Sequence, residues 1–111
     1  MKLPTDVVIA PDKLRHYLLL PREENDKSQF LAVAGYTSAN WQTLDHDLRQ
    51  LAMTQEVASA EPSPYGTTYE VHGLLRGPNG RTLRVITVWI TLAATGETRL
   101  VTLFPDREAR E

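Results

Sequence analysis

Residues 67–104 decide the fold, and they read TTYEVHGLLRGPNGRTLRVITVWITLAATGETRLVTLF. Three stretches rich in β-branched and aromatic residues alternate with turn-forming residues, which is typical of antiparallel strands. Between the first two stretches, GPNG at 77–80 predicts a tight hairpin, because glycine tolerates the positive φ that such turns often need. The sequence therefore predicts three antiparallel strands joined by short loops.

A hairpin turn centred on Pro78 and Asn79 determines which residues face each other across the first two strands. The expected pairs are Tyr69 with Val88, Val71 with Ile86 and Leu75 with Thr82. One face of the sheet is then expected to form the core, with Tyr69, Val71, Leu75, Ile86, Val88, Ile90, Val101 and Leu103. The other face is expected to be uncovered, with Thr68, Glu70, His72, Leu83, Val85, Thr87, Trp89, Leu100, Thr102 and Phe104.

The first half of the chain predicts helices. Pro11 fits the first turn of a helix that continues to Leu18. The run SQFLAVA at 28–34 predicts a short helix that ends at Gly35, in a C-terminal cap. Residues 39–54 place apolar side chains at spacings of three and four, which predicts an amphipathic helix that packs on the sheet.

Helices followed by strands predict an α+β fold of two layers, with the N-terminal helices packed on one face of a sheet of three to four antiparallel strands. The fourth strand is expected at the sheet edge, early in 56–66, because the prolines there exclude a central position. At 111 residues the chain is expected to be one domain, 1–111. Its parts are a mainly helical half at 1–54, the sheet at 55–105 and a charged tail at 106–111.

Composition limits the possible functions. The chain has no cysteine, so a disulfide framework and a thiolate nucleophile are excluded, and we expect neither a metal nor a cofactor. No apolar run is long enough to cross a bilayer, so we expect a cytoplasmic protein that does not bind membranes. The net charge of −2 disfavours a general nucleic-acid binder, although residues 66–104 hold four arginines against two acidic residues.

The expected register places Glu70 opposite Thr87, with His72 one step along the same face. A carboxylate and an imidazole are the pair that RNA cleavage without a metal requires. One group removes the proton of the 2′-hydroxyl and the other protonates the leaving 5′-oxygen. A cation must also stabilise the charged phosphorane, and the candidates are Arg76, Arg81 and Arg84. The alternative is that these are ordinary polar side chains on a solvated strand.

Two further features are compatible with RNA binding. Trp89 and Phe104 could stack on bases, or could instead be buried against a helix or a second subunit. Lys27 precedes the second predicted helix and is long enough to reach a phosphate there, although a solvated surface lysine is the alternative.

Several blocks of the sequence resemble a small bacterial domain family of uncharacterised function. They are KLP, KSQFLAVAGYTSANW, YGTTYEVHGLLRGPNGRT, TVWI and RLVTLFP. That family looks like a distant relative of the superfamily that contains barnase, EndoU, the tRNA-cutting colicins and RelE-type toxins. The resemblance implies metal-free RNA cleavage on the sheet face away from the helices. The matching blocks contain Lys27, Tyr65, Thr87, Trp89 and Thr102.

These inferences together predict the toxin-like half of a toxin–antitoxin type module, acting as a metal-independent endoribonuclease. The candidate catalytic residues are Glu70, His72, Thr87 and Thr102, and the candidate substrate-binding residues are Lys27, Arg76, Arg81, Arg84 and Trp89. A cognate antitoxin would cover the uncovered sheet face. The alternative is a non-enzymatic interaction module, either antitoxin-like, immunity-like or a homodimer, that uses the same face and agrees better with the acidic charge.

Overall fold

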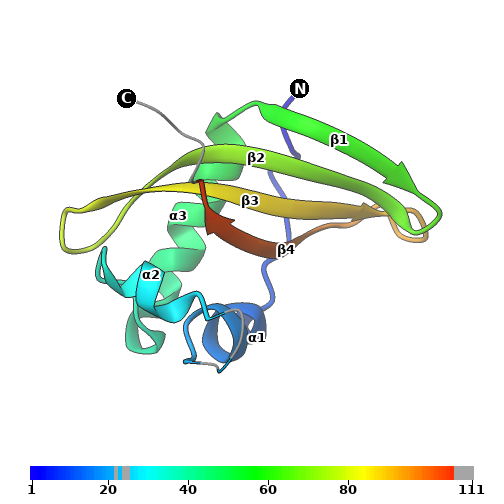
Figure 1. Cartoon of the computed structure of the whole chain (residues 1–111). Coiled ribbons are helices and arrows are strands. Elements are labelled where there is room, and N and C mark those ends of the chain that lie inside the picture. The colour runs from blue at the N-terminus through cyan, green and yellow to red at the C-terminus, as the bar shows by residue number, and fades with distance from the viewer. Residues whose placement is uncertain (22, 24–25, 107–111) are drawn as a thin grey trace.

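The computed structural model describes residues 1–21, 23 and 26–106. Its elements are α1 (Pro11–Lys13), η1 (Leu14–Leu18), α2 (Ser28–Ala32), η2 (Ser38–Asn40), α3 (Trp41–Thr54), β1 (Val57–Ser63), β2 (Gly66–Arg76), β3 (Thr82–Leu92) and β4 (Thr98–Pro105). In this part of the chain the strands form one antiparallel sheet in the order β1-β2-β3-β4. Figure 1 shows α3 crossing behind β2 and β3, with α1 and α2 beside β4. The predicted α+β class is confirmed.

The first predicted helix spans the expected residues but changes type along its length. Pro11 begins α1, and η1 then continues as a π-helix in which Leu19 N donates to Leu14 O at 2.8 Å. Leu14 and Leu18 are fully buried, so this turn is fixed to the core. π-Helical turns are rare and occur often at functional sites.

The second helix ends where the sequence indicated, and a capping box starts the third. Gly35 has a φ of 93°, and Tyr36 N donates to Leu31 O at 3.2 Å, as in the expected C-terminal cap of α2. Thr37 and Asn40 form a capping box at the start of η2, which continues into α3. The buried face of α3 consists of Leu44, Leu48, Leu51 and Ala52.

The pairing of β2 with β3 corrects the predicted register by one residue. The observed pairs are Tyr69 with Trp89, Val71 with Thr87 and Leu75 with Leu83. A slip of one residue turns every side chain of the shifted strand to the opposite face. As a result β3 buries Leu83, Val85, Thr87 and Trp89, whereas Ile86, Val88 and Ile90 lie on the other face and are only partly buried.

The loop between these strands causes the slip, because it contains three residues, 78–80, instead of two. Gly77 N donates to Arg81 O at 2.8 Å and so closes the loop one residue later than expected. Gly80 N bonds to Gly77 O at 3.0 Å, and Gly80 adopts a φ of 87°. A turn followed by one left-handed glycine is the usual three-residue hairpin loop.

A β-bulge changes the alternation in β4. Val88 pairs with Thr102 and Trp89 pairs with Leu100, so the residue between them, Val101, is extra. Leu100 and Leu103 are therefore both buried although three positions separate them. Val101, which was expected in the core, is only partly buried.

The hairpin loop is tied to the end of α2. Asn79 Nδ2 donates to Val33 O at 3.0 Å, and Asn79 N donates to Ala34 O at 3.3 Å. The backbone of Gly77 passes so close that a Cβ there would lie 1.9 Å from Ala34 O. These contacts fix α2 relative to the sheet.

Gly77→Ala is therefore expected to lower the free energy of unfolding by about 1–3 kcal/mol, because backbone must move to admit the methyl group. Gly80→Asn is the matched control. No atom lies within 4 Å of a Cβ at Gly80, and Asn tolerates the left-handed conformation, so its cost should be a few tenths of a kcal/mol. Urea unfolding of both variants measures the difference, and equal losses would contradict the close approach.

Candidate functional site

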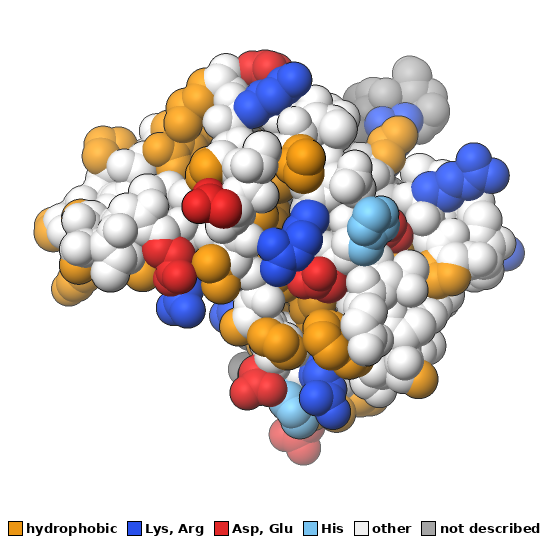
Figure 2. Space-filling view, turned by 180° about the vertical axis from the view of Figure 1, so that it is seen from behind, with side chains coloured by type: hydrophobic (Ala, Val, Ile, Leu, Met, Phe, Trp, Pro, Cys, Tyr) orange, Lys and Arg blue, Asp and Glu red, His pale blue; other side chains and the backbone are white. Residues whose placement is uncertain are grey.

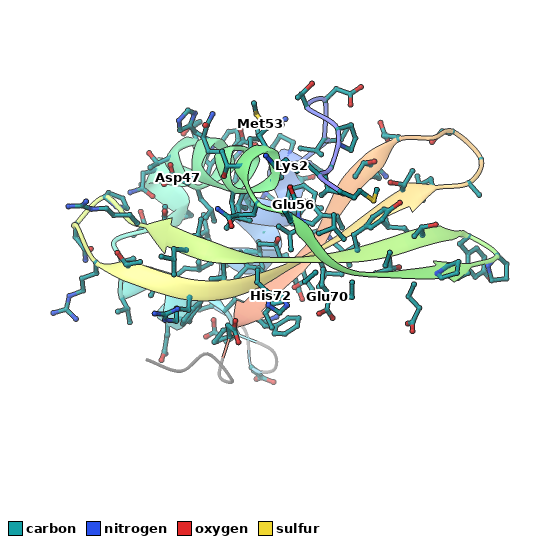
Figure 3. All side chains as sticks on the ribbon, turned by 90° about the horizontal axis from the view of Figure 1, so that it is seen from above. Lys2, Asp47, Met53, Glu56, Glu70 and His72 are labelled. Carbon is teal, nitrogen blue, oxygen red and sulfur yellow. The ribbon has the colours of Figure 1, made fainter. Side chains whose placement is uncertain are left out.

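The sheet face away from α3 carries the candidate site. We name it the open face, and it consists of Thr68, Glu70, His72, Leu74, Arg84, Ile86, Val88, Ile90, Thr102 and Phe104. Figure 3 shows Glu70 and His72 on the opposite side of the sheet from Asp47 and Met53 of α3. The apolar side chains of β3 run through the middle of the open face, and charged and hydroxyl side chains lie at its margins.

Glu70, His72 and Asp106 form the first cluster on this face. His72 Nε2 lies 3.6 Å from Glu70 Oε1, and His72 Nδ1 lies 3.8 Å from Asp106 Oδ2. The side chains of His72 and Glu70 are 45% and 42% exposed, whereas that of Asp106 is 15% exposed. Asp106 follows β4, where its N–H donates to Arg84 O at 3.0 Å and so extends the pairing by one residue. The imidazole is therefore accessible and lies between two carboxylates.

Lys27, Tyr17 and Thr102 form the second cluster, beside β4. The hydroxyls of Tyr17 and Thr102 share a hydrogen bond of 3.2 Å, and Lys27 Nζ donates to Thr102 Oγ1 at 3.4 Å. The hydrogen bond between Tyr17 and Thr102 and the charge of Lys27 lower the pKa of Tyr17, against the opposing effect of burial. The cluster combines an ammonium group, a phenol and an alcohol, all of which can donate hydrogen bonds to an anion.

The start of α2 is not the anion site that the position of Lys27 suggested. Asp26 Oδ1 accepts from Ser28 N at 2.7 Å and from Ser28 Oγ at 2.6 Å, so a carboxylate of the chain already occupies this end. The helix is also only five residues long. Lys27 instead reaches Thr102 across the edge of the sheet.

The two clusters lie in neighbouring parts of the open face. Glu70 pairs with Val88, and Val88 pairs with Thr102, so these residues form one row across three strands. The backbones of Glu70 and Thr102, at the two ends of this row, are two interstrand spacings apart, a distance of about 10 Å. Both clusters can therefore contact one extended ligand.

Thr87 and Trp89 do not lie on the open face, which corrects the prediction that they share it with Glu70 and His72. Both are 0% exposed. Trp89 Nε1 donates to Thr87 Oγ1 at 2.8 Å, and Thr87 Oγ1 donates to Val71 O at 2.8 Å, so their polar atoms are satisfied within the core. The one-residue shift of β3 is the cause. Phe104, in contrast, lies on the open face.

The predicted arginines are spread along the β2–β3 hairpin. Arg84 pairs with Leu74, one row beyond His72 on the same face. Arg76 pairs with Thr82 at the end of the hairpin, and Arg81 directly follows its loop. The structure thus brings Arg84 near the first cluster and leaves Arg76 and Arg81 further away.

Sequence reasoning did not identify Asp106 or Tyr17. Asp106 directly follows the last strand, and the correct β3–β4 register would have placed it beside His72. Tyr17 contacts Thr102 across 85 positions of sequence, and no local pattern predicts such a contact.

The side covered by α3 has a mixed surface. Figure 2 shows charged side chains of both signs mixed with apolar ones on this side. A cavity of about 210 Å³ there is lined by Asp47, Gln50, Leu51, Thr54, Gln55, Leu74, Leu75 and Arg76.

Across residues 1–21, 23 and 26–106, no three histidine or acidic side chains are arranged to hold a metal ion. Within the same residues, no helix is long and apolar enough to span a membrane.

Comparisons with known proteins give a family and a fold. The structure is similar to a chain of the contact-dependent growth inhibition toxin–immunity protein complex from Klebsiella pneumoniae 342. The TM-score is 0.71 at 16% sequence identity, and the match covers 89% of this chain and 99% of that chain. A comparison with curated proteins returned no match. The sequence matches the family described as "Domain of unknown function (DUF6883)" over residues 2–107, so the chain belongs to that family.

Proposed function

We propose that the chain is the toxin-like half of a toxin–antitoxin type module and that it cleaves RNA on its open face without a metal ion. The observation that carries this proposal is the pair of Glu70 and His72, whose accessible side chains lie 3.6 Å apart on the open face. The likeness in fold to a chain of a toxin–immunity complex supports a toxin-like or immunity-like role.

Glu70 acts as the base and His72 as the acid. An ionised carboxylate can accept the proton of a 2′-hydroxyl but has none to donate, whereas an imidazolium can donate one near neutral pH. The 2′-oxygen then attacks phosphorus, and the bond from phosphorus to the 5′-oxygen breaks as His72 protonates that oxygen. The products are a 2′,3′-cyclic phosphate and a 5′-hydroxyl.

Two other residues assist this reaction. Asp106, 3.8 Å from His72 Nδ1, orients the ring so that Nε2 is directed towards the open face. Arg84, in the next row, supplies positive charge to the phosphorane. Lys27 and Thr102 hold another part of the RNA.

The apolar middle of the open face favours the alternative function of an interaction module. Leu74 is 55% exposed, and Ile86, Val88, Ile90 and Phe104 are only partly buried. Apolar surface of this kind commonly binds protein. An antitoxin would cover it in the leading proposal. An antitoxin-like or immunity-like protein, or a homodimer, would use it without any chemistry.

Induced expression in a bacterial host distinguishes the two functions. A ribonuclease should arrest growth and fragment RNA, and co-expression of a neighbouring antitoxin gene should restore growth. The double variant Glu70→Gln, His72→Gln controls for the burden of expression. Normal growth with intact RNA, from folded wild-type protein at the level of the control, would contradict the ribonuclease and favour the interaction module.

A further inference from the structure

Side chains from three separate elements meet beside β4. Tyr17 comes from η1, Lys27 precedes α2, and Thr102 comes from β4. Tyr17 packs against the hydrophobic core, and η1 is fixed by the buried Leu14 and Leu18. The phenol is therefore held in position by the fold, as a binding group must be to act with low entropic cost.

Positive charge concentrates at this place in a chain of net charge −2. Lys13 Nζ lies 5.2 Å from the centre of the Tyr17 ring, and Lys27 Nζ lies 5.7 Å from it. Among the described residues, neither lysine forms an ion pair with a carboxylate. Two ammonium groups beside one phenol create a positive potential that attracts an anion.

We propose that Tyr17, Lys27 and Thr102 form a phosphate-binding subsite for single-stranded RNA, and that Tyr17 is a substrate-binding residue. The identification of the ligand as RNA rests on the proposed function. Lys27 supplies the charge, and the two hydroxyls, whose hydrogens can rotate, donate to the phosphate oxygens. The hydrogen bond between Tyr17 and Thr102 lowers the pKa of Tyr17, which is consistent with a site that stabilises negative charge.

The position of the subsite identifies which phosphate it binds. The backbones of Thr102 and Glu70 are about 10 Å apart across the sheet. The subsite is therefore too far away to contact the phosphate that reacts between Glu70 and His72. It instead holds a neighbouring phosphate of the same strand. The RNA backbone would then cross β3 between the clusters, over Val88. Phosphate contacts of this kind position the nucleic acid without reading its sequence.

The test measures binding of a fluorescent single-stranded 2′-O-methyl RNA, which lacks the attacking hydroxyl and cannot be cleaved. Tyr17→Phe keeps the packed ring and removes only the hydroxyl, and it should weaken binding about tenfold. Lys27→Ala should weaken binding by a similar factor and reduce the slope of log affinity against log salt by about 0.7. Tyr65→Phe, at a tyrosine that is 78% exposed in the β1–β2 turn, is the matched control and should bind like wild type.

Unchanged binding in both Tyr17→Phe and Lys27→Ala would overturn the subsite, as would a wild-type protein that does not bind this RNA. Cleavage of ordinary RNA separates this outcome from failure of the proposed function. If the variants lose binding but the wild type cuts no RNA, the subsite stands and the ribonuclease proposal fails. If the wild type cuts RNA, the variants should raise KM with little change in kcat, because they act on substrate binding and not on the reacting phosphate.

Discussion

His72→Ala is expected to lower the rate of RNA cleavage by about 10²–10⁴-fold, the usual contribution of a positioned general acid. His72 is the proton donor to the 5′-oxygen in the proposed reaction, and alanine cannot replace it. Glu70→Gln should cause a loss of similar size, because the amide keeps the shape of the side chain but cannot accept the 2′-hydroxyl proton. Single-turnover cleavage of a short RNA measures both rates.

His16→Ala is the matched control for this experiment. His16 is also an exposed histidine near a carboxylate, with Nε2 3.7 Å from Asp12 Oδ1, but it lies on η1 and not on the open face. Its removal should leave cleavage unchanged. A His72→Ala variant that is folded and cleaves RNA at the wild-type rate would show that the imidazole does not take part in the reaction.

Trp89→Ala is expected to lower the free energy of unfolding by about 3–5 kcal/mol, as is usual when a large aromatic side chain is deleted from a core. Trp89 is fully buried, and its loss would also leave Thr87 without the indole hydrogen bond. Since small domains are stable by only 5–15 kcal/mol, this loss is large enough to unfold much of the population at elevated temperature. Urea unfolding at 25 °C measures it.

Phe104→Ala is the matched control, because Phe104 is the aromatic residue that β4 places on the open face, where it is partly exposed. Its loss should cost clearly less than that of Trp89. If Trp89→Ala were as stable as wild type and instead weakened RNA binding, Trp89 would have to face the ligand, and the observed β2–β3 register would be wrong.

The local signals in the sequence were sufficient for the arrangement of elements. Pro11, Gly35 and Thr37 mark helix boundaries through backbone chemistry that acts within a few residues. The order of helices and strands then predicts the two layers. Local signals do not determine the register of β2 and β3, because it depends on whether Gly80 belongs to the loop or to the strand. Hairpin loops of two residues and of three residues are both common.

The candidate site was predicted only where local geometry decides it. Glu70 and His72 are two residues apart on one strand, so they share a face in any register. The assignment of Thr87 and Trp89 depended on pairing between strands, and a slip of one residue moved both into the core. Tyr17 and Asp106 join the site through contacts between distant segments, which the pattern of a single strand or helix does not contain.

The chemistry of the cut ends is the measurement that bears most directly on the proposed function. Purified wild-type protein, incubated with total RNA in the presence of a strong metal chelator, should produce fragments that end in a 2′,3′-cyclic phosphate and begin with a 5′-hydroxyl. The double variant Glu70→Gln, His72→Gln should produce none. Intact RNA with folded wild-type protein, or cleavage that the chelator abolishes, would contradict metal-free attack by the 2′-hydroxyl on the open face.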